Sequence, residues 1–382
     1  MRIDPPKQKF RIWNFDFLLI LLCGALTVIG IMSIYSADES LAMRQLYGFL
    51  LGVGLAVFLA FLDYHIFLKF YWLFYILNII LLFLVLRIGY SSHNAQRWLI
   101  VAGVRFQPAE TAKILLILFF AAFIMKYESR IRSLPFDLLC LLLVIPPIAL
   151  VFRQPDLSTS IMLVLIFAVI MFVGGISGKL IAAIVAIMVP AVPLLFYYAI
   201  QPDSPLVRGF QQRRILAWLH PEDYAMTEAY QTLNSLMAIG SGQLNGKGFD
   251  TNEISSVLSG GFISESQTDF IFTVIGEEFG FIGASAVIFL IFGIAVDAFV
   301  IAARAKDVGG RIIAAGLGAW IGFQGFLNIG VATGVMPNTG IPLPFVSSGL
   351  TSLLSTYIAV GFVLNVRMQE ESTISASYYR EF

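Results

Sequence analysis

Long apolar runs dominate the chain, and polar positions gather in the stretches between them. A helix needs about 20 apolar residues to cross a bilayer. Ten stretches near that length are predicted to be membrane-spanning helices: 15–36, 43–62, 67–88, 109–127, 136–152, 157–174, 179–199, 269–303, 312–333 and 351–367. The eighth is longer than a bilayer requires, which allows for a tilt or a break near Gly276 or Gly280. The pattern predicts an all-α polytopic membrane protein with a single integral membrane domain, residues 1–382.

Composition agrees with this class. Of the 382 residues, 58% are hydrophobic and 13% are charged, whereas soluble domains carry about 25% charged residues. The formal net charge is zero, so nothing indicates nucleic-acid binding. Cys23 and Cys140 both lie in apolar runs and are expected to pack without a disulfide or a metal. No cleavable signal peptide is evident, because the first apolar stretch is long for a signal-peptide core.

An even number of spans places both termini on the same side of the membrane. Clusters of basic residues flank the first, fourth and eighth spans on one face: Lys7, Lys9, Arg11, Lys126, Arg130, Arg132, Arg304, Lys306 and Arg311. The positive-inside rule makes that face cytoplasmic. Both termini, including a short polar tail at 368–382, are therefore expected in the cytoplasm.

The outer face carries two long polar segments. Residues 200–268 form a large loop with short amphipathic pieces, and a loop of that length is uncommon without a function. The second segment, 334–350, is rich in proline and glycine. Such backbone cannot form a helix facing lipid, so it is expected to lie against protein or a wet cavity.

Asp269 opens the eighth span, and Glu277 and Glu278 follow in the same predicted helix. An ionised acid near the bilayer centre costs roughly 2.5–3.5 kcal/mol on insertion scales, so such residues usually face a cavity or a partner. The acids are interpreted either as structural partners of Arg or Lys, or as part of a site. Thr268 is a candidate cap that would place Asp269 in the first helical turn. There the helix dipole favours the charged carboxylate and burial opposes it.

Glu110 and Lys113 lie three residues apart at the start of the fourth span, so they share one helix face. They are interpreted either as an internal ion pair, or as a pair that positions a catalytic carboxylate or binds an anion. Asp156 is interpreted as a cap of the sixth span, while Arg153 beside it is a candidate phosphate ligand.

Three arginines of the outer loop, Arg208, Arg213 and Arg214, form the remaining candidate cluster. Guanidinium groups match phosphate oxygens in a bidentate way. These cations therefore suit an anionic lipid headgroup, although a solvated loop face or attraction to anionic phospholipid explains them as well. No nucleophile, zinc or nucleotide-binding motif is present.

Several strings occur together in family order and resemble the SEDS family (shape, elongation, division and sporulation). They are AQRW (95–98), FQPAETAK (106–113), RQPDLST (153–159), AYQTLNSLMAIGSGQLNGKG (229–248), TDFIFTVIGEEFG (268–280) and NTGIPLPFVSSG (338–349). The last string is closest to the elongation branch, RodA. Ser348-Gly349-Leu350-Thr351 departs from the Tyr-Gly-Gly-Ser run that the family often has here, so a division or sporulation paralogue with the same chemistry is the alternative.

The resemblance implies a peptidoglycan glycosyltransferase that polymerises lipid II during cell elongation, with a fold similar to GT-C-like membrane glycosyltransferases. It implies a class B penicillin-binding protein and other elongation-complex proteins as partners, in the bacterial cytoplasmic membrane. The family's catalytic aspartate falls on Asp269. Its supporting residues fall on Glu110, Lys113 and Asp156. Its active site faces outside.

The hypothesis is that Asp269 acts as a general base toward the acceptor 4-hydroxyl, with inversion at the donor anomeric carbon. Cations that would stabilise the leaving pyrophosphate are Arg213, Arg214, Arg208 and Arg153. No cofactor is assigned, and a divalent cation, Mg²⁺ or Mn²⁺, stays open. A lipid II flippase explains ten helices and intramembrane charges equally well, and a non-catalytic scaffold is a third alternative.

Overall fold

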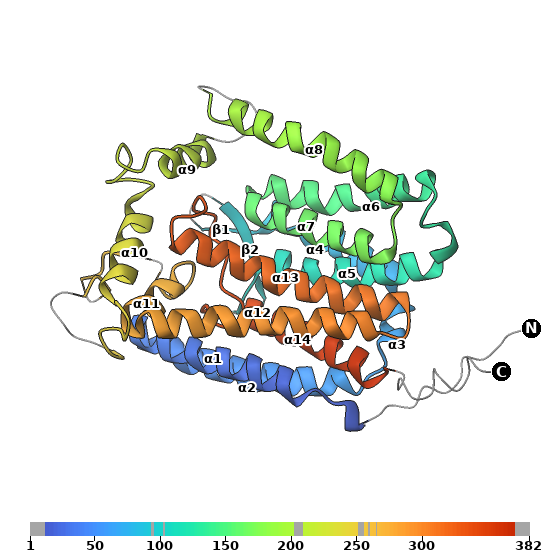
Figure 1. The fold of residues 1–382 in the computed structure, drawn as a ribbon, viewed down its shortest axis with the longest axis horizontal. Helices are drawn as coiled ribbons and strands as arrows, with labels where there is room; N and C mark the ends of the chain where they lie inside the picture. Colours follow the sequence, from blue (N-terminus) through green and yellow to red (C-terminus); the bar gives the residue numbers. More distant parts are fainter. Residues whose placement is uncertain are drawn as a thin grey trace, which may run out of the picture.

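The computed structural model describes residues 12–92, 95–101, 104–201, 209–250, 256–258, 260–264 and 266–370. Within these residues ten helices are long and apolar enough to span a membrane, as the sequence predicts. They are α1 (Phe17–Ala37), α2 (Glu39–Ala60), α4 (Tyr71–Ile88), α5 (Pro108–Lys126), α6 (Leu134–Arg153), α7 (Leu157–Gly174), α8 (Gly178–Ala199), α12 (Gly280–Arg304), α13 (Val308–Ala332) and α14 (Leu350–Met368). They run alongside one another as a bundle (Figure 1).

Shorter elements occupy the two ends of this bundle. They are the 3₁₀ turns η1 (Ile12–Asn14) and η2 (Glu128–Arg130) and the helices α3 (Tyr64–Leu68), α9 (Gly209–Leu219), α10 (Tyr230–Ser241) and α11 (Ile271–Glu278). Figure 1 places α9, α10 and α11 together at one end, called the loop end below, and α3 at the opposite end. The helix α9 lies within one of the amphipathic pieces predicted in the large loop.

A small antiparallel sheet at the loop end was not predicted. Its strands are β1 (Tyr90–Ser92), β2 (Ala95–Val101) and β3 (Val104–Phe106), in the order β1-β2-β3. Tyr90 pairs with Trp98, and Leu99 pairs with Phe106. The strands are short, so their formation depends on mutual pairing more than on any local hydrophobic pattern.

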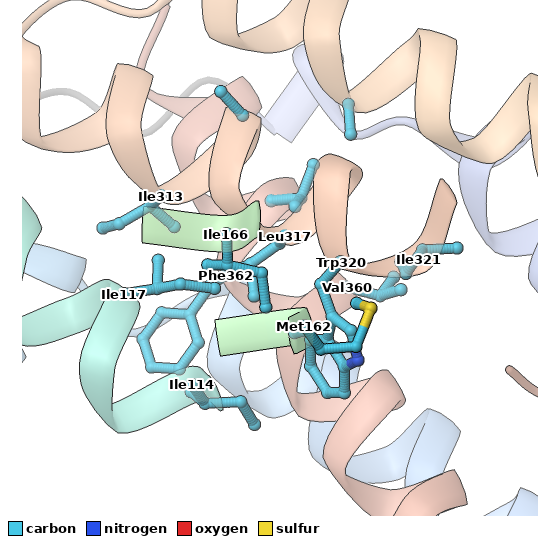
Figure 2. Packing of buried hydrophobic residues seen from close by; sticks show 14 of the residues in the cluster. Ile114, Ile117, Met162, Ile166, Ile313, Leu317, Trp320, Ile321, Val360 and Phe362 are labelled. Carbon is cyan, nitrogen blue, oxygen red and sulfur yellow. The ribbon is translucent and has the colours of Figure 1, made fainter. Parts of the chain in front are cut away.

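The core of the bundle lies where α13 meets α5, α7 and α14. Figure 2 shows apolar side chains from all four helices in one layer: Ile114 and Ile117, Met162 and Ile166, Ile313, Leu317, Trp320 and Ile321, and Val360 and Phe362. Close approach depends on small residues, as is usual between helices in a membrane. A Cβ at Gly316 of α13 would lie 3.2 Å from the Ile117 side chain of α5.

The predicted eighth span is two helices, because the chain breaks between α11 and α12. Gly280 has φ +63°, and a Cβ there would lie 2.3 Å from the backbone nitrogen of Gly246. Only glycine fits this conformation and this contact. The break predicted near Gly280 is therefore confirmed. The prediction that Thr268 caps the helix and places Asp269 in its first turn is wrong, because α11 starts at Ile271 with Phe270 as its N-cap.

Helix α8 and the chain ends complete the arrangement. None of the apolar window of α8 is buried by the described chain, and Figure 1 shows the helix along the edge of the bundle.

Arg367 near the end of α14 lies with its Nε 3.6 Å from Asp16 Oδ2, just before α1. The first and last spans therefore meet at the opposite end, as an even number of spans predicts.

Candidate functional site

Asp269 is half-buried at the loop end, in the turn that precedes α11. Its turn is bound to the proline- and glycine-rich segment by backbone and hydroxyl contacts. The Ser347 hydroxyl donates to the Thr268 carbonyl oxygen at 2.6 Å, and the Ser348 N–H donates to the Gln267 carbonyl oxygen at 2.9 Å. These contacts confirm that the segment 334–350 lies against protein. They also give the Ser347 hydroxyl a structural role.

Gly340 forms one wall of the space around the Asp269 carboxylate. Its φ is +67°, and a Cβ there would lie 3.2 Å from Asp269 Oδ2. A side chain would be strained by the backbone conformation and would press on the carboxylate. A glycine at this position therefore lets the carboxylate pack directly against the backbone of the 338–348 segment.

Arg214, on α9, is a loop arginine that interacts electrostatically with Asp269. Burial lowers the pKa of its guanidinium, the Arg97 charge lowers it further, and the charges of Asp269 and Glu228 oppose that change. Its one hydrogen bond to a named partner is long, 3.5 Å from Nη1 to the Asn338 carbonyl oxygen. A guanidinium has five N–H donors, and within the described part of the chain this contact uses one of them.

Arg213 points elsewhere. Its Nε donates to Glu228 Oε1, and its side chain is 57% exposed. Burial alone would raise the pKa of Glu228, but hydrogen bonds from Arg213 and Thr227 outweigh it and leave that pKa below its ordinary value. Arg208 lies outside the described residues. Of the two loop arginines that the structure describes, the geometry thus favours Arg214 over Arg213.

A pocket of about 80 Å³ opens beside Arg214, between α9, α10 and the start of the 334–350 segment. It is lined by Arg214, Ala217, Trp218, Pro221, Glu228, Ala229, Thr232, Leu233, Leu236, Gly334, Met336, Pro337 and Asn338. Sites for drug-sized ligands measure about 300–1,000 Å³. This pocket therefore has room for one substituent of a large substrate.

Asp156 is the N-cap of α7, as predicted. Its carboxylate accepts a hydrogen bond from the Thr159 N–H at 3.0 Å, and its Oδ2 lies 3.7 Å from Arg97 Nε. Arg97, on β2, also donates from Nη2 to the Pro155 carbonyl oxygen at 2.6 Å. Arg153 is exposed in the last turn of α6. Sequence reasoning passed over Arg97, whose place depends on the unpredicted sheet.

Glu110 and Lys113 form an ion pair within α5, as their spacing predicts. Lys113 Nζ lies 2.7 Å from Glu110 Oε1, and the two side chains are 1% and 2% exposed. Lys113 Nζ also donates to Gln324 Oε1 at 2.7 Å and lies 4.6 Å from the centre of the Trp320 ring. The pair is thus buried between α5 and α13 and tied to a further polar residue.

Glu277 and Glu278 lie at the end of α11, so their predicted place deeper in a membrane span is wrong. Glu277 accepts hydrogen bonds from Lys247 Nζ at 2.8 Å and from the Val257 N–H at 2.9 Å. Glu278 accepts from the Ser36 hydroxyl at the end of α1. The interpretation of Glu277 as a structural partner of a lysine is confirmed.

Two amides of α13 were missed from the sequence. Asn328 Nδ2 donates to the carbonyl oxygen of Asp269 at 2.8 Å, and Gln324 Nε2 donates to that of Pro342 at 2.9 Å. The available signal was two polar residues four apart in an apolar span, which share a helix face. Among the described residues, no three His, Cys, Asp or Glu side chains gather as a metal site. The divalent cation therefore stays an untested prediction.

Comparison with known proteins places this arrangement in a family. The FtsW/RodA/SpoVE family model, described as "Cell cycle protein", matches residues 12–372. Peptidoglycan glycosyltransferase MrdB of Escherichia coli (strain K12) is 34% identical over 372 residues, covering 96% of this chain and 97% of MrdB. A probable peptidoglycan glycosyltransferase FtsW of Geobacter sulfurreducens is 30% identical over 375 residues, covering 93% and 96%.

Solved structures agree. A chain of the structure described as "Structural coordination of polymerization and crosslinking by a peptidoglycan synthase complex" superposes with a TM-score of 0.76 at 27% identity, covering 92% of this chain and 97% of that one. The rod shape determining protein RodA of Thermus thermophilus gives a TM-score of 0.67 at 28% identity, covering 94% and 98%. The chain belongs to the SEDS family, that of FtsW, RodA and SpoVE.

Proposed function

We propose that this chain is a peptidoglycan glycosyltransferase that polymerises lipid II into glycan strands during cell elongation, with Asp269 as its general base. The observation that supports this most is a half-buried carboxylate at the loop end, in a turn held by Asn328 and Ser347 and within the electrostatic reach of Arg214. The relatives that cover nearly the whole chain carry the name peptidoglycan glycosyltransferase.

The base has one proton to move. The 4-hydroxyl of the acceptor N-acetylglucosamine attacks the anomeric carbon of the donor N-acetylmuramic acid, and Asp269 accepts the hydroxyl proton as the new bond forms. A sugar hydroxyl is a poor nucleophile, and a positioned base contributes about 10²–10⁴-fold. A direct attack from the face opposite the leaving group inverts the anomeric centre, through a transition state with oxocarbenium character.

The leaving group is undecaprenyl pyrophosphate, which takes the electron pair of the broken carbon–oxygen bond. Its negative charge grows on departure, so a fixed cation stabilises the transition state more than the bound substrate. Arg214 is our first candidate for this task because its guanidinium is half-buried and interacts electrostatically with Asp269. Arg97 reinforces the positive charge from the neighbouring strand. Arg213 and Arg153, which are exposed, are weaker candidates, and Arg208 stays an untested candidate outside the described residues.

The supporting residues act through structure in this proposal. Glu110 and Lys113 hold the helices beneath the site, and Asp156 holds the start of α7 next to Arg97. The prenyl chains lie along the apolar flank of the bundle next to α8. The apolar window of α8 is not buried by the described part of the chain.

The proposal also includes the orientation of the bundle in the membrane and a protein partner. The loop end faces the outside of the cytoplasmic membrane, and both termini lie in the cytoplasm, as the basic clusters indicate. A class B penicillin-binding protein is the proposed partner, because a structural relative belongs to a complex described as coordinating polymerization and crosslinking.

Purified protein tests the proposal when it is incubated with lipid II and the glycan strands are resolved on a gel. Asp269→Asn keeps the size of the side chain and removes the base. We expect it to bind lipid II normally and to polymerise about 10²–10⁴-fold more slowly. The matched control is Asp223→Asn, an exposed acid of the same loop, which should leave polymerisation unchanged.

Two results would reject the proposal. Strands of normal length and yield from Asp269→Asn would remove that residue as the base. Transfer of labelled lipid II across liposomes without any polymer, by the unaltered chain with its partner present, would identify a flippase instead.

A further inference from the structure

We infer that Asn328 is the positioning residue of Asp269, fixing the turn that carries the carboxylate against the proline- and glycine-rich segment. This inference rests on the proposed function, since it explains how the base is held. Asn328 lies in the last two turns of α13, and its side chain is 1% exposed. An unpaired polar group is costly at that depth. Among the described residues Asn328 Oδ1 has no partner, so the bonds that its NH₂ group donates are what compensates for burying the amide.

The Asn328 amide joins two segments that are far apart in sequence. Its Nδ2 donates to the carbonyl oxygen of Asp269 at 2.8 Å and to that of Ile341 at 2.7 Å. One NH₂ group thus holds the backbone on both sides of the carboxylate site. Gly340, the residue before Ile341 in the chain, packs against the Asp269 carboxylate itself.

The chemistry of the two partners fixes the orientation of the amide. Both are carbonyl oxygens, which only accept hydrogen bonds, so the NH₂ side of Asn328 must face them. An aspartate of the same shape would place an oxygen there and repel both carbonyls. A leucine would fill the volume with no donor. The position therefore requires a side chain with two N–H donors at this reach.

The same face of α13 continues the restraint toward the buried ion pair. Gln324, one turn earlier, donates to the Pro342 carbonyl oxygen at 2.9 Å and accepts from Lys113 Nζ at 2.7 Å. Adjacent carbonyls at 341 and 342 are thus held by amides four residues apart on one helix. Most residues of α13 are buried in the core of the bundle. The hydrogen bond from Asn328 therefore fixes the turn of Asp269 relative to that core.

The test compares two buried asparagines of the same bundle. Asn328→Leu should lower kcat for lipid II polymerisation by about 10²-fold, the effect expected when a catalytic group shifts by about 1 Å. The KM for lipid II should stay within about twofold, since the substrate contacts remain. Measurements use the full chain with its transpeptidase partner, with the kcat referred to the folded fraction.

Asn365→Leu is the matched control. Asn365 is 0% exposed, and its Nδ2 donates to the carbonyl oxygens of Ala60 and Leu62 at 2.6 Å each, at the opposite end of the bundle. Its Oδ1 also accepts from the Tyr64 N–H and from Gln369 Nε2, so the Asn365→Leu variant loses more hydrogen bonds than Asn328→Leu, and loses them far from the site. We expect its unfolding midpoint to fall at least as much as that of Asn328→Leu while its kcat stays near the original.

If the kcat of Asn328→Leu and of Asn365→Leu falls only in proportion to the fall in each unfolding midpoint, the inference is overturned. Asp269 would remain the proposed base in that case. If Asn328→Leu does not reach the membrane, Asn328→Ser, which keeps one donor, is held to the same criterion. Normal polymerisation by Asp269→Asn would instead reject the proposed function, whatever the Asn328 variants do.

Discussion

Glu110 and Lys113 show what a single pair of charges does inside this bundle. Their side chains are at most 2% exposed, so both ions have lost most of their hydration. The attraction between them offsets a desolvation cost of several kcal/mol per ion, and such pairs are weak evidence for stability. Lys113 also donates to Gln324, which holds the Pro342 carbonyl oxygen. The pair is better explained as fixing the site than as stabilising the fold.

Removing one partner separates these two effects. Lys113→Met leaves Glu110 as an unpaired buried charge, and we expect the free energy of unfolding to fall by about 3–5 kcal/mol. The double variant Glu110→Gln, Lys113→Met should recover most of that loss, because no charge is left unpaired. Its polymerisation should stay reduced, because Gln324 Oε1 loses Lys113 as a donor and keeps the Trp320 Nε1 donor alone. Thermal unfolding in detergent and the glycan-strand gel measure the two quantities.

An exposed ion pair provides the comparison for that experiment. Arg213 pairs with Glu228, but its side chain is 57% exposed, and exposed pairs contribute at most about 1 kcal/mol. Arg213→Met should therefore change the unfolding midpoint little. Full polymerisation by the double variant Glu110→Gln, Lys113→Met would show that the hydrogen bond from Lys113 to Gln324 is not required for activity.

At the scale of helices and strands, hydropathy predicts the membrane-spanning helices but not all of the segments that connect them. All ten spans were predicted, because membrane helices are marked by length and composition along the chain. The break at Gly280 was predicted from an over-long run. The sheet at 90–106 was not, since strands of three to seven residues depend on their partners.

The site was predictable only in part, for the same reason. Glu110 and Asp156 are acids at span ends, and Asp269 lies at the start of an apolar run, features that a single sequence reveals. The contact of Asn328 with Asp269 and Ile341 joins residues 59 and 13 positions apart. No local pattern specifies such pairing. The turn before α11 also escaped prediction, because Thr268 looks like a cap in sequence and its carbonyl is instead bound by Ser347.

Helix α3 is joined to the start of α13 by a histidine between two acids. His65 Nδ1 lies 2.7 Å from Asp63 Oδ1, and Nε2 lies 2.8 Å from Asp307 Oδ2. Asp307 in turn caps α13 by accepting from the Gly310 N–H at 2.7 Å. Burial alone would lower the pKa of His65, but the two carboxylates outweigh it and the pKa lies above its ordinary value of 6.5.

This junction should make stability depend on pH in a known direction. A histidine whose pKa is raised by folding stabilises the protein fully below its unfolded pKa of about 6.5, and the effect is lost as the pH rises through the higher folded pKa. The unfolding midpoint of the original chain should therefore exceed that of His65→Asn most at pH 6. The excess should shrink toward pH 9. A difference that does not vary with pH would show that His65 contributes by packing alone.

At the scale of the whole molecule, the two ends of the bundle differ in kind. The loop end carries α9, α10, α11, the sheet and Asp269, whereas the opposite end carries α3, the connection between α5 and α6, and the meeting of Arg367 with Asp16 (Figure 1). Lipid II polymerisation outside the cell requires the loop end to face outward. The proposed chemistry therefore depends on the orientation of the whole bundle.

Cysteine labelling measures that orientation directly. The native thiols of Cys23 and Cys140 are both 0% exposed, so the unaltered chain should react little with a membrane-impermeant maleimide. Met226→Cys, at a position 85% exposed at the loop end, should react in intact spheroplasts. Ser129→Cys, exposed between α5 and α6, should react only after the membrane is permeabilised. The reverse pattern would place Asp269 toward the cytoplasm, where the growing strand is absent, and would exclude the chain as a polymerase of the outer face.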